Sequence, residues 1–234
     1  ILSHVARGRT VSVVIFSAGT HGIPDSEAAD CRTARQSESL AAAAVLGYGT
    51  PRFLDHPDRG LQYGEQLVGE IQSLCAETGA DLVYAPSVFE MHPDHRMLGM
   101  AAVEALRRSG GNVQLAQYEI GMPLHPNCLL DISDQQARKE AAMACFVSQN
   151  AHQRYDQHIA ALNRYRTYTL PASVSAAEAF LLVSAQDLQG DPLGLYRSEH
   201  ERQQALGLPL AAADIPLVSV LVRSMDRPTL RSAL

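Results

Sequence analysis

The chain has 234 residues, of which 46% are hydrophobic, and a formal net charge of −6. A chain of this length can bury one sizeable core. Its acidic balance argues against a nucleic-acid partner, whose phosphates would call for a basic face. No stretch reaches the roughly 18 apolar residues of a membrane-spanning helix. The four cysteines form no C-x-x-C pair, as is typical of a reduced compartment, so we expect a cytoplasmic protein without a membrane span.

Apolar runs and helical patterns alternate along the chain. The expected strands are residues 11–17, 51–55, 81–86 and 113–120, and the expected helices are residues 32–47, 61–79 and 92–111. Strands and helices that alternate with short loops are typical of βαβ units. We therefore predict an α/β fold with a doubly wound, mostly parallel, Rossmann-like sheet in three α/β/α layers. Residues 133–166 are expected to be mostly helical, and residues 177–186 to form another strand.

Both ends of the chain differ from this pattern. The first residue is Ile1, and residues 1–8, ILSHVARG, resemble the second half of a helix. We therefore expect a further N-terminal segment, and with it the first strand, to precede the given sequence. Near residue 208 a proline-flanked linker begins, and a fresh apolar strand follows it. The predicted organisation is a domain at 1–207, a linker at 208–215 and the start of another domain at 216–234.

The stretch EMHPDHR, from Glu90 to Arg96, joins an expected strand to an expected helix. Ligands of open α/β folds bind at the carboxyl edge of the sheet, where this stretch lies. Pro93 suits the first turn of a helix, which places His92 and His95 on roughly the same side of that turn. Together with Asp94, they could provide a metal ligand, an acid/base histidine and an orienting carboxylate. The alternative is a capped helix with two surface histidines, since a zinc site needs about three protein ligands.

Other histidines carry weaker signals. His21 follows the first expected strand, also at the edge of the sheet, so contact with a ligand is one interpretation. The stretch from Asp55 to Asp58, DHPD, resembles a second copy of the motif without its final histidine, and we interpret it as a loop near the site. His125, His152 and His158 are interpreted as surface or loop residues.

Four segments together resemble one family, the zinc-dependent N-acetylglucosaminyl deacetylases related to the PIG-L and LmbE proteins. They are VVIFSAGTHG (13–22), ARQSESLAAAAVLG (34–47) with its R-x-x-E pattern, FLDHPDRGL (53–61) and ADLVYAPSVFEMHPDHRMLGMAAVEAL (80–106). The resemblance covers roughly residues 1–205. It implies an enzyme that uses Zn²⁺ to remove the acetyl group of an N-acetylated amino sugar or glycoconjugate.

The resemblance also implies roles for individual residues. His95 matches a zinc ligand, His92 the acid that protonates the leaving amine, and Asp94 the carboxylate that orients His92. Two further positions, Arg35 and Asp58, match residues that bind the sugar. The family's first strand ends in a His-Pro-Asp-Asp-Glu motif, which provides two zinc ligands and the general base and which would lie before residue 1.

One position departs from the family pattern. Many relatives carry a tyrosine two residues before the first histidine of HPDH, and Glu90 stands there in this chain. The oxyanion contact of that tyrosine is therefore not expected here. This departure, with the missing first motif, keeps open an alternative: a catalytically incomplete sugar-binding or scaffolding domain of the same fold. Another metal hydrolase, such as a phosphoesterase, would need more carboxylate ligands near HPDH.

The C-terminal residues 216–234, PLVSVLVRSMDRPTLRSAL, resemble the opening strand of family-two glycosyltransferases. That resemblance implies a protein that couples deacetylation to glycosyl transfer in glycan or glycoconjugate biosynthesis. A generic strand, loop and helix is the alternative for this segment. The sequence leaves the acyl sugar unnamed, and an oligomer is compatible with it.

Overall fold

The computed structural model describes residues 1–17, 19–20, 23–190 and 194–195. Almost all of them belong to one compact unit, Ile1–Asp191. The predicted linker at 208–215 and the glycosyltransferase-like segment at 216–234 lie outside the described residues. The division into domains therefore stays a prediction.

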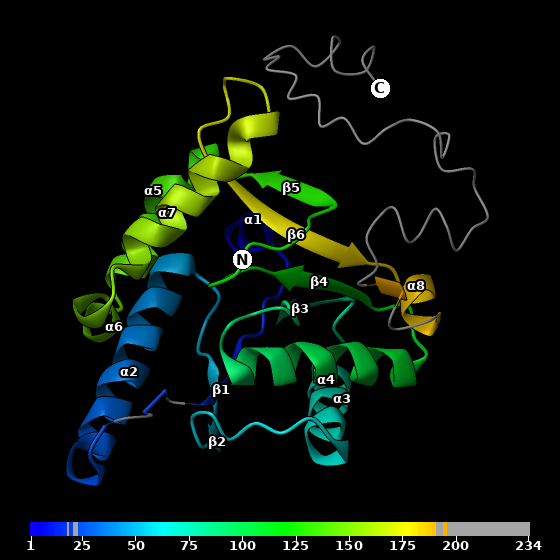
Figure 1. Ribbon diagram of the computed structural model, residues 1–234, viewed down its shortest axis with the longest axis horizontal. Coiled ribbons are helices and arrows are strands. Elements are labelled where there is room, and N and C mark those ends of the chain that lie inside the picture. The colour runs from blue at the N-terminus through cyan, green and yellow to red at the C-terminus, as the bar shows by residue number, and fades with distance from the viewer. Residues whose placement is uncertain (18, 21–22, 191–193, 196–234) are drawn as a thin grey trace, which may run out of the picture. The chain divides into compact units, whose positions relative to one another are not determined.

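Helices and strands alternate over the first half of the described chain, as the sequence predicts (Figure 1). The helices are α1 (Leu2–Ala6), α2 (Asp25–Leu46), α3 (Glu65–Thr78), α4 (Pro93–Ser109), α5 (Gln136–Ala144), α6 (Val147–His152), α7 (Tyr155–Tyr165) and α8 (Ala185–Gln189), with short 3-10 turns η1 (Ser133–Gln135) and η2 (Arg166–Thr169). The strands are β1 (Val14–Ser17), β2 (Arg52–His56), β3 (Leu82–Pro86), β4 (Gln114–Tyr118), β5 (Cys128–Asp131) and β6 (Ala177–Val183).

The described strands form two sheets, one of order β1-β2 and one of order β3-β4-β6-β5. β1 and β2 are parallel, as are β3 and β4, whereas β6 runs antiparallel to both of its neighbours. The predicted α/β class with a parallel-rich sheet is confirmed. The antiparallel direction of β6 and the existence of β5 were not predicted.

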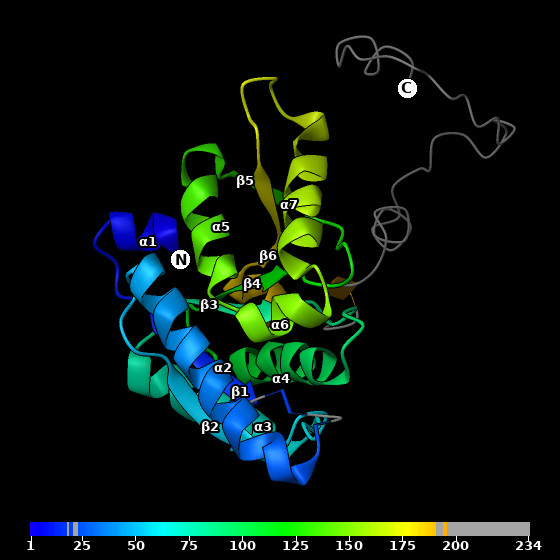
Figure 2. The ribbon, with the colours of Figure 1, turned by 90° about the vertical axis from the view of Figure 1, so that its left-hand side faces the viewer.

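Helices lie on both sides of these strands (Figures 1 and 2). α4 packs on β3 and β4 and has α3 beside it, while α7 packs on β6 and α2 packs on α5. The contact of α4 with β3 is close, because a Cβ at Gly99 would lie 2.5 Å from the carbonyl oxygen of Pro86. Ala101 and Ala105 of the same helix are fully buried. The missing side chain of Gly99 therefore lets α4 pack closely against the end of β3.

Strand β1 is less buried than its sequence predicts. The run VSVVIFS is typical of a strand covered on both faces, yet all of Val14–Ser17 are only half-buried. Among the described residues, β1 pairs only with β2 and β3 only with β4. A cavity of about 1190 Å³ lies between them, lined by residues of β1, β3, α1 and α3. The apolar side chains of β1 and one edge of each strand therefore face this cavity.

Helix ends follow ordinary capping rules. α2, α3 and α4 each end at a glycine in the left-handed conformation, namely Gly47, Gly79 and Gly110. α2 begins at Asp25, earlier than the predicted residue 32, because the polar segment before residue 32 continues the helix. Within the described part of the chain, no helix is long and apolar enough to cross a membrane.

Candidate active site

The HPDH motif lies where the sequence predicts it, between the end of β3 and the start of α4. His92 is the N-cap of α4, with extended φ and ψ angles of −71° and 129°, and Pro93 is in the first turn. Pro lacks an N–H that would be unpaired there, so it begins the helix at little cost. The two histidine rings consequently lie together, with centroids 4.8 Å apart.

Asp94 connects this turn to the loop after β2. It is 4% exposed, its Oδ2 accepts the backbone N–H of Arg59 at 2.7 Å, and its Oδ1 accepts that of Leu61 at 3.1 Å. Arg59 adopts a left-handed φ of 61°, which is unfavourable for a residue with a Cβ. Both oxygens of Asp94 therefore bind a strained turn, and this turn carries Asp58.

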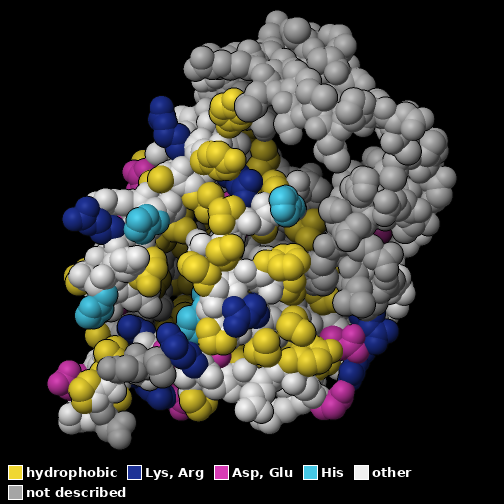
Figure 3. Space-filling view, viewed as in Figure 1, with side chains coloured by type: hydrophobic (Ala, Val, Ile, Leu, Met, Phe, Trp, Pro, Cys, Tyr) yellow, Lys and Arg dark blue, Asp and Glu magenta, His cyan; other side chains and the backbone are white. Residues whose placement is uncertain are grey.

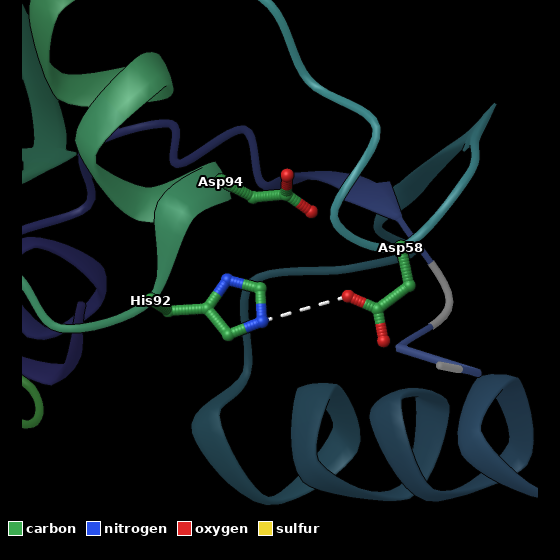
Figure 4. Close-up of side chains that lie close together, drawn as sticks. All are labelled: Asp58, His92 and Asp94. Atoms are coloured by element: carbon green, nitrogen blue, oxygen red, sulfur yellow. Dashed lines mark ion pairs between the residues drawn. The ribbon is translucent and has the colours of Figure 1, made fainter. Parts of the chain in front are cut away.

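Asp58 reaches back to the motif from that turn (Figure 4). Its Oδ1 lies 3.5 Å from Nε2 of His92. One ligand atom each from Asp58, His92 and Asp94 lies within 4.8 Å of the others, a spacing at which the three could hold a metal ion. Residues 58 and 94 belong to separate segments, so the fold rather than local sequence brings these carboxylates together.

Burial lowers the pKa of His92 below its ordinary value, and the neighbouring His95 acts in the same direction. The carboxylates of Asp58 and Asp94 oppose this effect, and the cation of Arg59 adds to it. The net result favours the neutral imidazole. A neutral imidazole can accept a proton or bind a metal, so both predicted types of chemistry are open to it.

His95 faces a buried carboxylate that the sequence did not assign to the site. Glu90 is 1% exposed, and its Oε2 lies 3.8 Å from Nδ1 of His95. Burial alone would raise the pKa of Glu90, but His95 and the backbone N–H groups of residues 120–122 outweigh it and hold the pKa below its ordinary value. Glu90 is therefore a buried anion behind the histidine pair.

Arg35 approaches the same region from α2. Its guanidinium donates a hydrogen bond to the carbonyl oxygen of Gly19, which has a left-handed φ of 66°. A Cβ at Gly19 would collide with Nη1 of Arg35 and lie 3.9 Å from Oδ2 of Asp58. Arg35 and Asp58, the two residues predicted to bind the sugar, thus both lie close to Gly19. The space beside Gly19 is too small for a side chain.

The residues predicted from the sequence are accordingly gathered in one region. The exception is His21, which lies outside the described residues. The part of Asp94 in holding the Asp58 loop was not predicted, since the resemblance assigned it only to orienting His92. The position of Glu90 was recognised as a departure, but its burial behind His95 depends on a loop about 30 residues further along, which no local pattern reveals.

Comparison with known proteins finds similarity over the same part of the chain. Residues 1–106 match the family model described as PIG-L, GlcNAc-PI de-N-acetylase. Over these residues the chain is similar to the PIG-L family. The matched residues include β1, β2, β3 and the HPDH motif, and so every residue that the sequence analysis assigned to the site.

A curated protein also matches this chain in sequence. The diacetylchitobiose deacetylase of Thermococcus kodakarensis is 28% identical over 160 residues, which are 61% of this chain and 60% of that protein. The chain thus spans about three fifths of the length of this curated relative. The activity of the whole protein is therefore a matter for proposal.

Two solved structures share the fold. The N,N'-diacetylchitobiose deacetylase of Pyrococcus horikoshii has a TM-score of 0.66 at 19% identity, covering 82% of this chain and 79% of that one. GalB of Pseudomonas putida, a 4-carboxy-2-hydroxymuconate hydratase, has a TM-score of 0.67 at 20% identity, covering 78% of this chain and 87% of that one. At these identities the likeness concerns the fold alone. Because one protein is a deacetylase and the other a hydratase, the reaction has to be argued from the site.

Proposed function

We propose that the protein is a zinc-dependent hydrolase that removes the acetyl group from an N-acetylated amino sugar. The observation that carries this proposal is the convergence of two histidines, His92 and His95, with the carboxylates of Asp58 and Asp94 at the carboxyl edge of β3. The PIG-L match over residues 1–106 supports the choice of reaction. The Thermococcus relative, a diacetylchitobiose deacetylase, supports an N-acetylated sugar as the substrate.

The donor atoms in this region suit zinc. His92, His95, Asp58 and Asp94 offer imidazole nitrogens and carboxylate oxygens, which are ordinary zinc ligands. The closest donor set is Asp58, His92 and Asp94, whereas the resemblance assigns zinc to His95. We favour His95, because Asp94 already accepts two backbone N–H groups and Asp58 lies beside the acid/base histidine.

When bound there, zinc would supply a Lewis acid that polarises the acetyl carbonyl and activates water for attack. The residues of the chain perform the remaining tasks. His92, which is neutral at rest, takes up the proton that the attacking water loses and donates it to the amine nitrogen as the C–N bond breaks. Asp58, 3.5 Å from Nε2 of His92, stabilises the imidazolium formed in between. Arg35 and Asp58 hold the sugar near the histidines.

A zinc site needs about three protein ligands, so His95 requires others. We propose that a further strand lies between β1 and β3 and carries them. In the part of the chain that the structure describes, β1 pairs only with the parallel β2 and β3 only with the parallel β4, and residues of β1 and β3 line the cavity of about 1190 Å³. A strand added there would cover the half-buried side chains of β1 and end at the same edge as HPDH.

The alternative is a sugar-binding or scaffolding domain without catalysis. Glu90 in place of the tyrosine of many relatives is the observation that favours it. The two functions differ in whether acetate is released. A place in glycan or glycoconjugate biosynthesis, a cytoplasmic location and the glycosyltransferase-like segment at 216–234 stay predictions.

The test is acetate release from N,N'-diacetylchitobiose and from N-acetylglucosamine conjugates by the full-length protein supplied with zinc. We expect turnover by the wild type and a loss of at least about 100-fold in His92→Gln, as for removal of a general acid. His125→Gln is the matched control, because His125 is an exposed histidine outside the cluster. Sugar binding without acetate release, or wild-type turnover in His92→Gln, would contradict the proposal.

A further inference from the structure

Glu90 is an almost completely buried carboxylate without a part in the proposed mechanism. It is 1% exposed and lies in the short loop between β3 and the HPDH turn. Burying a charge is costly unless hydrogen bonds or other charges compensate for it. The partners of this carboxylate therefore indicate what it does.

Three backbone N–H groups from a distant loop bind the Glu90 carboxylate. Oε1 accepts the N–H of Ile120 at 2.6 Å and that of Met122 at 3.4 Å, while Oε2 accepts the N–H of Gly121 at 2.9 Å. The loop approaches closely, since a Cβ at Gly121 would lie 3.4 Å from Oε2. The carboxylate is thereby fixed in position before any ligand binds.

The fixed carboxylate faces His95. Oε2 lies 3.8 Å from Nδ1 of His95, beyond hydrogen-bond distance but within reach of a small rotation of the ring. That Nδ1 is buried and has no hydrogen-bond partner. A carboxylate beside one imidazole nitrogen holds the proton there and leaves the lone pair on the other nitrogen. Glu90 thus favours the tautomer of His95 whose Nε2 can bind a metal.

We propose that Glu90 is a positioning residue that sets the tautomer and orientation of His95 and couples them to the loop at 120–122. The proposal deepens the proposed function and rests on it in one respect, namely that His95 is a metal ligand. A purely structural role, in which Glu90 only anchors the loop, is the competing account.

Glu119 provides a matched control for that competing account. It lies next to the same loop, its side chain is 5% exposed, and it accepts the N–H of Leu124 at 2.9 Å and a hydrogen bond from Nε of Arg166 at 2.9 Å. Glu119→Gln therefore removes a buried charge that holds this part of the chain. It leaves the Glu90–His95 contact in place.

The experiment measures the zinc dissociation constant of the full-length protein by competition with a chromophoric chelator. We expect zinc to bind about 10–100-fold more weakly to Glu90→Gln, as for loss of a carboxylate behind a ligating histidine, and nearly unchanged to Glu119→Gln. Equal affinities for the wild type and Glu90→Gln would overturn the proposal. An equal loss in both variants would also overturn it, because disturbance of the loop would then suffice.

A second readout needs no metal. In zinc-free protein, ¹⁵N NMR of the His95 ring should show the Nδ1–H tautomer in the wild type and in Glu119→Gln, and a mixture of tautomers in Glu90→Gln. An unchanged tautomer in Glu90→Gln would overturn the proposal. If the wild type binds no zinc, the zinc-dependent function fails, and the tautomer alone then decides whether Glu90 positions His95. If Glu90→Gln does not fold, Glu90→Asp replaces it as the test, because the shorter side chain keeps the negative charge but moves it away from His95. We then expect a loss of zinc affinity smaller than the about 10–100-fold expected for Glu90→Gln.

Discussion

Replacement of Asp94 by asparagine tests how the site is held together. The carboxylate is 4% exposed and accepts two backbone N–H groups, at 2.7 and 3.1 Å. Hydrogen bonds to a charged group contribute about 1.5–3 kcal/mol each. Asparagine keeps one acceptor, but its NH₂ group meets the other N–H, and the charge is lost. We therefore expect Asp94→Asn to lower the free energy of unfolding by about 2–4 kcal/mol.

The assay is urea unfolding of zinc-free protein, followed by circular dichroism, with the midpoint and slope compared between variants. Asp131→Asn is the matched control, because Asp131 also accepts two hydrogen bonds, from the N–H and hydroxyl of Ser133, but is exposed. We expect only a small change in that variant. An Asp94→Asn midpoint within error of Asp131→Asn would refute the reasoning that a buried carboxylate holds the Asp58 loop.

Three further predictions concern packing, a buried ion pair and pH. Gly99→Ala should lower the free energy of unfolding by about 1–3 kcal/mol, because its Cβ would lie 2.5 Å from a backbone carbonyl oxygen of β3. Gly69→Ala, whose Cβ would meet no atom within 4 Å, should raise the free energy of unfolding by up to about 1 kcal/mol. Thermal unfolding shows whether the melting temperature falls in the first variant and rises in the second. Arg166→Met should cost about 3–5 kcal/mol in urea unfolding, since it leaves the 5%-exposed Glu119 without its cation, and no loss would show that the pair is dispensable. The pKa of His92 is lowered from 6.5, so just below pH 6.5 the unfolded state binds more protons than the folded state, and the free energy of unfolding should fall as the pH drops. In His92→Gln the slope of the unfolding free energy against pH should be shallower. An unchanged slope would contradict the lowered pKa of His92.

Much of the fold follows from local patterns in the sequence. The run DLVYAP and the helix after Pro93 were predicted within a residue or two of β3 and α4, because apolar periodicity and a proline at the first turn act locally. Strand β5 and the antiparallel direction of β6 were not predicted, since strand direction depends on long-range pairing. The half-burial of β1 was also not predicted, because a β-branched apolar run indicates a strand that is stable when buried but does not show which elements pack on it.

The part of the candidate site that lies in one short segment was predicted from the sequence, and the part that depends on long-range contacts was not. His92, Asp94 and His95 come from one short stretch, so the sequence alone placed them together. The loop that carries Asp58 is joined to that stretch by hydrogen bonds between residues about 35 positions apart, and Glu90 acquires its burial from a loop about 30 positions away. Such contacts depend on the folded chain and leave no periodic signal.

The most direct test of the central claim is the zinc content of the purified full-length protein, measured by mass spectrometry of the metal together with protein concentration. We expect about one zinc per chain in the wild type, nearly none in His95→Ala, and the wild-type content in the exposed-histidine control His125→Ala. A wild type without zinc, or a His95→Ala variant that retains zinc and full deacetylase activity, would contradict the account.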